Sequence, residues 1–354
     1  MSALSPAPRS MGYAVAASVT AVLLLLFVGT LGGTVHRSIT TETLSRFSTT
    51  VLIFGYLLST IGLVVSLRAL VNSIKAKKLS ATGEILKARA EAATSRQFSF
   101  ITFGLIFAVA IVFALIQLLL MNNGSLQSTF LDLEPMRESF KDILIAFGVN
   151  IKLALISQAF VLAFGLVLAV ARMIPGPAGA PIRFLAVGYI DLMRAVPAII
   201  VLYLIGFGLP LTNLPLVSGL SPEWFAIIAL SLTYSAYVAE IYRSGISSIH
   251  PSQWSASRSL GFSYLQTLRY FILPQAIRLV IPPLLSTFIA LQKDTSLVNV
   301  IGTLDAFNQA KFYASSSFNL SSVTVVAILF IAITIPQTRY VDWILAKDAK
   351  RIRG

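Results

Sequence analysis

The residues of this sequence that could do chemistry are a few charged side chains set among apolar ones. Glu240 and Arg243 lie three positions apart, so they share one face of a helix, where they could form a structural ion pair or act in gating or solute contact. Lys293 and Asp294 are adjacent, and adjacent residues of a helix point in different directions. We therefore expect one of them to face a solute pathway and the other to face a neighbouring helix. Such a pair suits a small solute that carries both charges.

Further polar and helix-breaking residues accompany these charges. Arg194 precedes Pro197 at the start of an apolar stretch, where the arginine could either anchor a helix at a membrane surface or line a pathway. Ionisable groups inside membrane segments are costly and by default indicate a pathway or a pairing role. We count Thr295 and Ser296, directly after Asp294, among the pathway or gating candidates. Five prolines are expected either to break helices along a cavity or to make packing kinks only: Pro197, Pro210, Pro274, Pro282 and Pro283.

The sequence lacks the residues that metal binding, nucleophilic catalysis by cysteine or nucleotide binding would need. The sequence has no cysteine, which excludes disulfides, thiolate metal sites and cysteine nucleophiles, and its two histidines, His36 and His250, are far apart, which argues against a zinc site. It contains no G-x-x-x-x-G-K-[ST] motif that could cradle a phosphate. We therefore expect no cofactor, no metal and no enzymatic activity in this chain. A membrane-embedded enzyme would need a polar catalytic cluster, and the sequence contains none.

The composition indicates that these residues sit in a membrane protein. Of 354 residues, 56% are hydrophobic and 12% are charged, against roughly 25% charged in an average soluble domain. Long stretches without Asp, Glu, Lys or Arg separate the charges, and each stretch long enough to cross a bilayer is expected to be a helix. This gives an all-α, multi-pass bundle of about eight spans. The expected spans are 12–33, 50–70, 98–121, 145–172, 185–208, 224–242, 276–295 and 318–338.

The basic residues predict the orientation. With the amino terminus inside, 20 of the 27 lysines and arginines fall in inner segments and 7 fall outside, as the positive-inside rule requires. We therefore expect both termini in the cytoplasm and the protein in the cell (inner or plasma) membrane. The first span is too long for a signal peptide and lacks a clear cleavage site, so we expect it to be retained.

A polar stretch divides the chain into two parts. Residues 122–140 begin with Asn122-Asn123-Gly124 and are interpreted as an external loop. We expect an N-terminal extension, 1–140, with three spans and a basic cytoplasmic segment at 75–97, and a second domain at 141–354. The segment 75–97 either fixes topology or contacts lipid head groups or a partner subunit.

The segment after the sixth span is the most informative. Proline at 251 disfavours helix in the residue before it, so a short helix is expected from Ser252, which could cap it, to a stop at Gly261. A second short helix is expected over 263–271, before Leu273-Pro274. Trp254, Leu260 and Phe262 are expected to expose apolar surface at the inner mouth of the bundle, which indicates a docking element that a partner covers.

Several ordered sequence boxes resemble one family. These are Tyr189-Ile190-Asp191-Leu192-Met193-Arg194-Ala195-Val196-Pro197, Ala236-Tyr237-Val238-Ala239-Glu240-Ile241-Tyr242-Arg243-Ser244-Gly245-Ile246, Ser255-Ala256-Ser257 with Gly261, Ile272-Leu273-Pro274-Gln275-Ala276, and Lys293-Asp294-Thr295-Ser296-Leu297. Over about 145–345 they resemble the inner-membrane permease subunits of ABC importers, in the branch for polar amino acids (histidine, glutamate, glutamine, arginine and opines). The resemblance implies a five-helix permease core and a cytoplasmic coupling loop, about 243–275, that docks in a cleft of an ATPase dimer.

The resemblance also implies partners and roles. It implies cytoplasmic ABC ATPase subunits that bind the ATP, an extracytoplasmic solute-binding protein, and a dimer with a second copy or with a sister permease. No nucleic-acid partner is expected. The residues expected to form the ATPase-coupling loop are Ser252, Gln253, Trp254, Ser255, Ala256, Ser257, Leu260, Gly261 and Pro274.

The loop departs from the family pattern. Ser255 stands where the family's E-A-A loop usually has an acidic residue, and Ser252 stands where the family usually has a glycine before Gln253. Leu285-Ser286 replaces the usual Gly-Asn after the double proline. Because the acid supports the ATPase contact in the family, weaker docking or a divergent partner is expected. The alternative function is a stand-alone secondary transporter or channel for a small polar solute, which would be expected to carry buried acids along several helices and inverted repeats.

Overall fold

The computed structural model describes residues 9–215, 217 and 219–353. Within these ranges the chain is helical and contains no β-strand, so the predicted all-α fold is confirmed. It forms two compact units, one ending at Asp132 and the other beginning at Leu133. The expected boundary lay eight residues later, at 140. The chain divides earlier because Leu133 already begins a long helix of the second unit.

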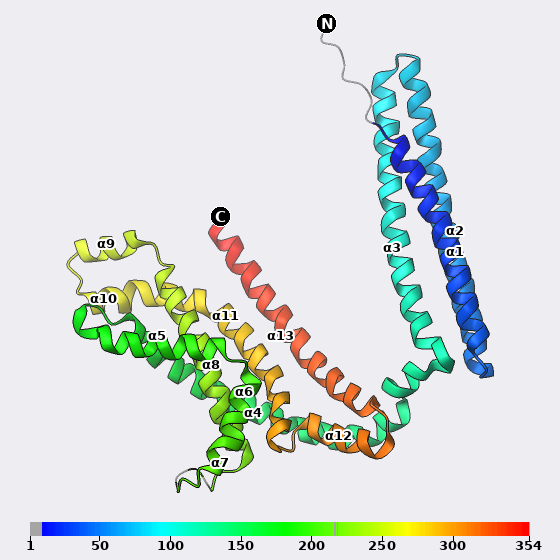
Figure 1. Ribbon diagram of the computed structural model, residues 1–354. Coiled ribbons are helices and arrows are strands. Elements are labelled where there is room, and N and C mark those ends of the chain that lie inside the picture. The colour runs from blue at the N-terminus through cyan, green and yellow to red at the C-terminus, as the bar shows by residue number, and fades with distance from the viewer. Residues whose placement is uncertain (1–8, 216, 218, 354) are drawn as a thin grey trace. The chain divides into compact units, whose positions relative to one another are not determined.

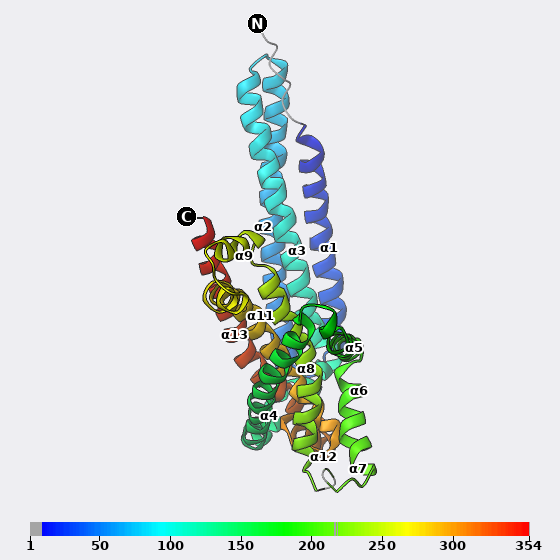
Figure 2. The ribbon, with the colours of Figure 1, turned by 90° about the vertical axis from the view of Figure 1, so that its left-hand side faces the viewer.

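The first unit consists of three long helices that lie side by side (Figures 1 and 2). They are α1 (Met11–Ser38), α2 (Glu42–Ala81) and α3 (Ile85–Phe130). The α2–α3 hairpin continues past the start of α1. Large apolar side chains such as Phe54 and Phe107 point outward and are at least 60% exposed, as expected for helices that face lipid.

Small residues form the contacts within the first unit. The buried positions of α2 recur every three, four or seven residues and are all Ser, Gly or Ala: Ser48, Gly55, Ser59, Gly62, Ser66, Ala69, Ser73 and Ala76. In membranes, helices associate through such residues because small side chains let two backbones approach closely. Ser95 of α3 donates a hydrogen bond to the carbonyl oxygen of Ala69 at 2.7 Å, which also fixes the register of the two helices.

The polar stretch at 122–140 is mostly helical, so its interpretation as a loop was wrong. Only Asn122, Asn123 and Gly124 form a left-handed turn, with φ of 52°, 58° and 73°, a conformation that Asn and Gly tolerate better than other residues. The Asn123 side chain holds this turn against the α1–α2 connection through two hydrogen bonds to Thr40, each 2.6 Å. Glu134 and Glu138 lie exposed on α4, with Glu134 in its first turn, where a negative charge is favourable.

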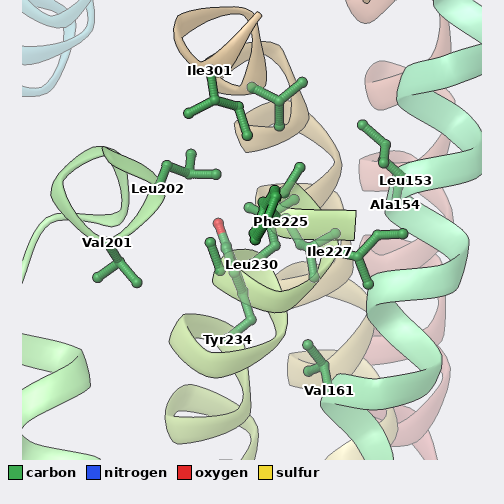
Figure 3. Packing of buried hydrophobic residues seen from close by; sticks show 14 of the residues in the cluster. Leu153, Ala154, Val161, Val201, Leu202, Phe225, Ile227, Leu230, Tyr234 and Ile301 are labelled. Carbon is green, nitrogen blue, oxygen red and sulfur yellow. The ribbon is translucent and has the colours of Figure 1, made fainter. Parts of the chain in front are cut away.

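The second unit is a bundle around two long helices. Its elements are α4 (Leu133–Met173), η1 (Pro177–Gly179), α5 (Ala180–Ala195), α6 (Ala198–Tyr203), η2 (Leu204–Gly208), α7 (Leu209–Leu211), α8 (Pro222–Ser247), α9 (Pro251–Ser259), α10 (Tyr264–Thr267), η3 (Leu268–Ile272), α11 (Leu273–Asp294), η4 (Thr295–Ile301), α12 (Ala306–Ser317) and α13 (Ser321–Arg353). The largest buried cluster joins α4, α6, α8, α11 and η4. Figure 3 shows Leu153 and Val161 of α4 facing Leu230 and its neighbours on α8.

Among the residues that the structure describes, six helical segments are long and apolar enough to cross a membrane, and a bent helix pair could form a seventh span. One of the six, Ile85–Met173, contains two of the expected spans, 98–121 and 145–172. The bent pair corresponds to the expected span 185–208: α5 and α6 meet at 103°, with Val196 extended before Pro197. A multi-pass membrane bundle is thus confirmed, while the number of eight spans stays a prediction.

Three of the other prolines, Pro274, Pro282 and Pro283, do not break a helix, so the first of the two alternatives does not hold for them. Pro282 and Pro283 lie inside α11 and do not end it, and Pro274 lies in its first turn without separating it from the preceding helix. A π-helical turn, Leu268–Ile272, directly precedes Pro274. A proline ring clashes with the carbonyl four residues earlier in a regular α-helix, and the wider turn relieves this clash. The helix therefore continues from Tyr264 to Asp294, and the expected short helix 263–271 is only its beginning.

Candidate functional site

The predicted coupling segment forms a short helix with well-defined ends. His250, not Ser252 as expected, caps α9: its Nδ1 accepts a hydrogen bond from the Ser252 backbone N–H at 3.2 Å. The helix ends as predicted at Gly261, whose φ is +86°. The N–H groups of Gly261 and Phe262 donate to the carbonyls of Arg258 (3.0 Å) and Ser257 (3.3 Å), which completes a Schellman motif. The left-handed φ is the physical reason for a glycine at this position.

Buried contacts seat α9 on the following helix. Ser257, which is buried, bonds the Thr267 hydroxyl at 3.1 Å, and Trp254 stacks on Tyr264 with ring centroids 5.2 Å apart. A capping box of Ser263 and Gln266 begins α10. The segment is therefore a defined two-helix element.

The apolar surface of this element differs from the expectation. Trp254 and Phe262 are half-buried, because Trp254 stacks on Tyr264 and Phe262 packs edge-on against Phe271. Leu260 is 73% exposed, as expected, and Leu265, also 73% exposed, adds to the apolar surface. Ser252, Gln253, Ser255 and Ala256 are also exposed. Pro274 is exposed and lies in the first turn of α11, after the π-turn. It therefore belongs to a different helix from α9.

Glu240 lies at the centre of a cluster of arginines from three helices. Its carboxylate pairs with Arg172 of α4, with Arg243 of α8 at 3.0 Å and with Arg194 of α5 at 3.9 Å. The Glu240 side chain is only 17% exposed, so these positive charges offset the cost of holding a carboxylate away from water. The spacing predicted the pair with Arg243. The sequence did not predict the contact with Arg172. In the predicted topology, Arg172 and Glu240 both lie at the cytoplasmic ends of their spans, 145–172 and 224–242.

Two adjoining clefts connect this cluster with Asp294. The first has a volume of about 590 Å³ and the second about 460 Å³, and they share Arg194, Tyr237 and Thr287. Glu240 and Arg243 line the second cleft. The residues lining the first are Arg194, Ala195, Val196, Pro197, Ala198, Thr233, Tyr234, Tyr237, Ser286, Thr287, Ala290 and Asp294. The structure thus places a carboxylate and a guanidinium in the walls of the first cleft.

The two adjacent charges of the 293–294 pair lie in different surroundings. Asp294 lines the first cleft and accepts a hydrogen bond from the Tyr234 hydroxyl at 2.8 Å. Lys293 is exposed and does not line that cleft. The structure therefore brings Asp294 together with Arg194 and Pro197, whereas Lys293 lies elsewhere. The Ser296 hydroxyl donates to the Lys293 carbonyl at 2.8 Å.

Thr295 belongs to a buried polar junction that the sequence did not reveal. Asn150 of α4 donates to the Thr295 carbonyl and hydroxyl oxygens (3.2 Å each) and to Asp305 Oδ2 (3.0 Å), and it accepts from the Ala306 N–H at 3.0 Å. Asp305 is fully buried and caps α12. Asn150 lies inside a long apolar span, and a lone amide there was the only signal that could have pointed to this junction.

The same unit that carries these clefts matches known proteins. A model of the family described as binding-protein-dependent transport system inner membrane component matches residues 162–350. The chain is 35% identical over 192 residues to the probable amino-acid ABC transporter permease protein YckA of Bacillus subtilis (strain 168), covering 54% of this chain and 82% of that protein. The chain belongs to this family of inner-membrane permease components. The predicted resemblance is thereby confirmed.

Further matches agree with this membership. The permease chain is 33% identical over 217 residues to the probable amino-acid ABC transporter permease protein PatM of Vibrio harveyi, covering 61% of this chain and 96% of that protein. The crystal structure of an amino acid ABC transporter with histidines superposes with a TM-score of 0.56 at 28% identity, covering 60% of this chain and 97% of that chain. The permease family match includes α5, α8, α9 and both clefts, whereas the three-helix first unit lies outside it.

Proposed function

We propose that this permease moves a polar amino acid inward through the bundle, driven by ATP hydrolysis on partner subunits. The observation that carries the proposal is the first cleft, whose walls hold Asp294 and Arg194 with five hydroxyl side chains. A free amino acid carries both an ammonium and a carboxylate, so charges of both signs can orient it. The names of similar proteins support the class: a glutamate transport permease of Corynebacterium glutamicum and an arginine transport permease of Bacillus subtilis (strain 168) are 35% and 30% identical.

The partners follow from what this chain lacks and what it exposes. The chain has no phosphate-cradling motif, so ATP binds to separate cytoplasmic ABC ATPase subunits. Those subunits bind the element formed by α9 and α10, where Leu260 after α9 and Leu265 of α10 expose apolar surface. An extracytoplasmic solute-binding protein delivers the amino acid, and a second permease, either an identical copy or a sister, completes the path. Both termini then face the cytoplasm, as the distribution of basic residues predicts.

Closure of the ATPase dimer would move α9 and bias the bundle between two states. Ser255, which replaces the family's usual acid, is exposed on α9, and its hydroxyl donates to the Pro251 carbonyl at 3.3 Å as its one side-chain hydrogen bond in the part of the chain that the structure describes. The substitution Ser255→Glu should therefore strengthen binding of the ATPase. It restores the usual charge without disturbing a buried contact.

The test is ATP-dependent uptake by the assembled transporter. The tagged chain is purified with its ATPase, reconstituted in sealed vesicles with the binding protein, and supplied with labelled amino acids. Gly261→Asp should abolish both ATPase co-purification and uptake, because it strains a left-handed position and adds a charge at the end of α9. Gly176→Asp is the matched control: Gly176 also has a positive φ, +79°, and open space for a side chain. ATP-independent uptake by the purified chain alone would support the stand-alone transporter instead.

A further inference from the structure

The first unit contains a cleft that the transport cycle does not use. It has a volume of about 480 Å³ and lies between the start of α1 and the second half of α2. Its walls are formed by Arg9, Ser10, Met11, Gly12, Ser73, Ala76, Lys77, Ser80 and Ala81. A side chain built on Gly12 would meet no atom within 4 Å, so the cleft is open at this position.

The cleft has the chemistry of an anion site. Arg9 and Lys77 contribute two exposed positive charges, and among the described residues neither has an ion-pair partner. None of the described residues that line the cleft is acidic. Three hydroxyls lie beside the cations, and those of Ser10 and Ser73 are hydrogen-bonded to each other at 2.9 Å. Two cations with several hydroxyl donors are the groups that bind phosphate oxygens.

The start of α1 adds further donors to this set of side chains. The helix is 28 residues long, no side chain caps its first N–H groups, and its first turn has no acidic residue. Met11 and Gly12, which carry two of these N–H groups, both line the cleft. Free N–H groups at a helix start carry partial positive charge and favour an anion.

The cleft also lies where lipid head groups are found. The uncharged stretch of α1 begins directly after Arg9, and Ser73 contacts Ser10 at the same level of α2, so the cleft is at the end of the apolar spans. Lys75 and Lys78 flank it on α2, and the α2–α3 hairpin continues beyond (Figure 1). Basic residues at this level attract anionic lipid.

We propose that this cleft binds a phosphate group, with an anionic phospholipid head group as its source. Arg9 and Lys77 hold the phosphate oxygens between them, the Ser80 hydroxyl and the start of α1 donate to them, and the acyl chains extend along the outward apolar faces of the unit. The site is independent of the proposed transport function, because its residues lie outside the family match.

The experiment measures lipid binding to the full chain. The protein is purified in neutral detergent, stripped of lipid, and titrated with phosphatidylglycerol or phosphatidylcholine while native mass spectrometry counts the bound lipids. The double variant Arg9→Gln/Lys77→Gln should weaken binding of phosphatidylglycerol by about 25-fold, or about fivefold per charge. Arg9→Lys/Lys77→Arg should restore it. Binding of phosphatidylcholine, whose head group has no net charge, should be weaker and should change less.

The matched control is Lys75→Gln/Lys78→Gln, which removes two equally exposed charges from α2 that do not line the cleft. If both double variants weaken binding equally, or if neither does, the proposal is overturned. Titration with inorganic phosphate identifies the source. If inorganic phosphate binds and the Arg9→Gln/Lys77→Gln variant loses this binding, the site is assigned to free phosphate. If that variant loses only the binding of phosphatidylglycerol, the site is assigned to lipid. Thermal unfolding and size-exclusion elution confirm that every variant is folded.

Discussion

The Tyr234 hydroxyl on α8 donates a hydrogen bond to Asp294 Oδ2 on α11, with 2.8 Å between the two oxygens. Both residues line the first cleft, which Arg194 of α5 also lines. The contact joins two helices that also enclose the large buried cluster of the second unit. It fixes the orientation of the carboxylate toward which a solute ammonium group would move.

Asp294→Asn should lower uptake of the transported amino acid about tenfold, because it removes a charge while keeping the shape of the cleft. The measurement is the initial rate of uptake in vesicles containing the assembled transporter. The control is Lys293→Gln, which removes the neighbouring charge from an exposed position outside the cleft and should change uptake less than about twofold. A larger loss with Lys293→Gln than with Asp294→Asn would assign the solute contact to the lysine.

Glu240→Gln should destabilise the second unit by about 1–2 kcal/mol. A fully buried ion pair that loses one partner costs about 3–5 kcal/mol, and the partial exposure of Arg194 and Arg243 reduces that figure. Thermal unfolding in detergent measures the effect. Glu223→Gln breaks the exposed ion pair with Lys152, in which Nζ and Oε2 are 2.8 Å apart. This variant should lower the free energy of unfolding by less than about 1 kcal/mol. Equal losses for the two variants would contradict a special role for the arginine cluster.

Gly55→Ala should destabilise the first unit by about 1–3 kcal/mol, because the added methyl group would lie 2.7 Å from the buried Phe113 ring. Gly104→Ala is the control: it is also in a helix, but its added methyl group meets no atom within 4 Å. We expect that variant to be unchanged or stabilised by up to about 1 kcal/mol. Thermal unfolding of both variants checks the prediction. If the Gly104 variant is destabilised as much as the Gly55 variant, close packing on Phe113 is not the cause.

The buried junction around Asp305 predicts a pH effect. Burial raises the pKa of the Asp305 carboxyl above its ordinary value of 3.8, although the hydrogen bonds from Asn150 and from backbone N–H groups oppose the shift. The folded state then binds the proton more tightly than the unfolded state does. Stability from this group is therefore complete below pH 3.8 and falls as the pH rises through the raised pKa.

Thermal unfolding of the wild type and of Asp305→Asn over this pH range measures the contribution. The wild type should lose melting temperature relative to the variant as the pH rises from about 4. The difference between the two curves isolates this carboxyl from the other acids. A constant difference across the range would show that the pKa of Asp305 does not change on folding.

The sequence was most informative about features that repeat along one helix or are local to a few residues. Charge-free stretches predicted membrane helices, and Gly261, nine residues after Ser252, predicted the end of α9. The pair of Glu240 and Arg243 followed from helical spacing alone. Expectations that depended on solvent exposure were less accurate. Trp254 and Phe262 were expected to be exposed, but each packs on an aromatic ring that follows it in the sequence.

Prolines show the limit of local reasoning. Pro197 ends a helix, but Pro282 and Pro283 continue one, and Pro274 follows a π-turn that absorbs its clash. Whether a helix bends or breaks at a proline depends on the neighbouring helices that satisfy the freed backbone groups, and those neighbours are not encoded next to the proline.

The sequence by itself determined that this chain is a multi-pass helical membrane protein of the permease family, because hydrophobicity, helical period and short motifs are properties of neighbouring residues. Only the tertiary structure brought Arg172, Arg194 and Glu240 together, set Asp294 apart from Lys293 in the wall of a cleft, and joined Asn150 to Asp305. Arg172 and Glu240 are 68 positions apart, and Asn150 and Asp305 are 155 positions apart. Their contacts arise from how α4, α5, α8, α11 and α12 pack, which no local pattern specifies.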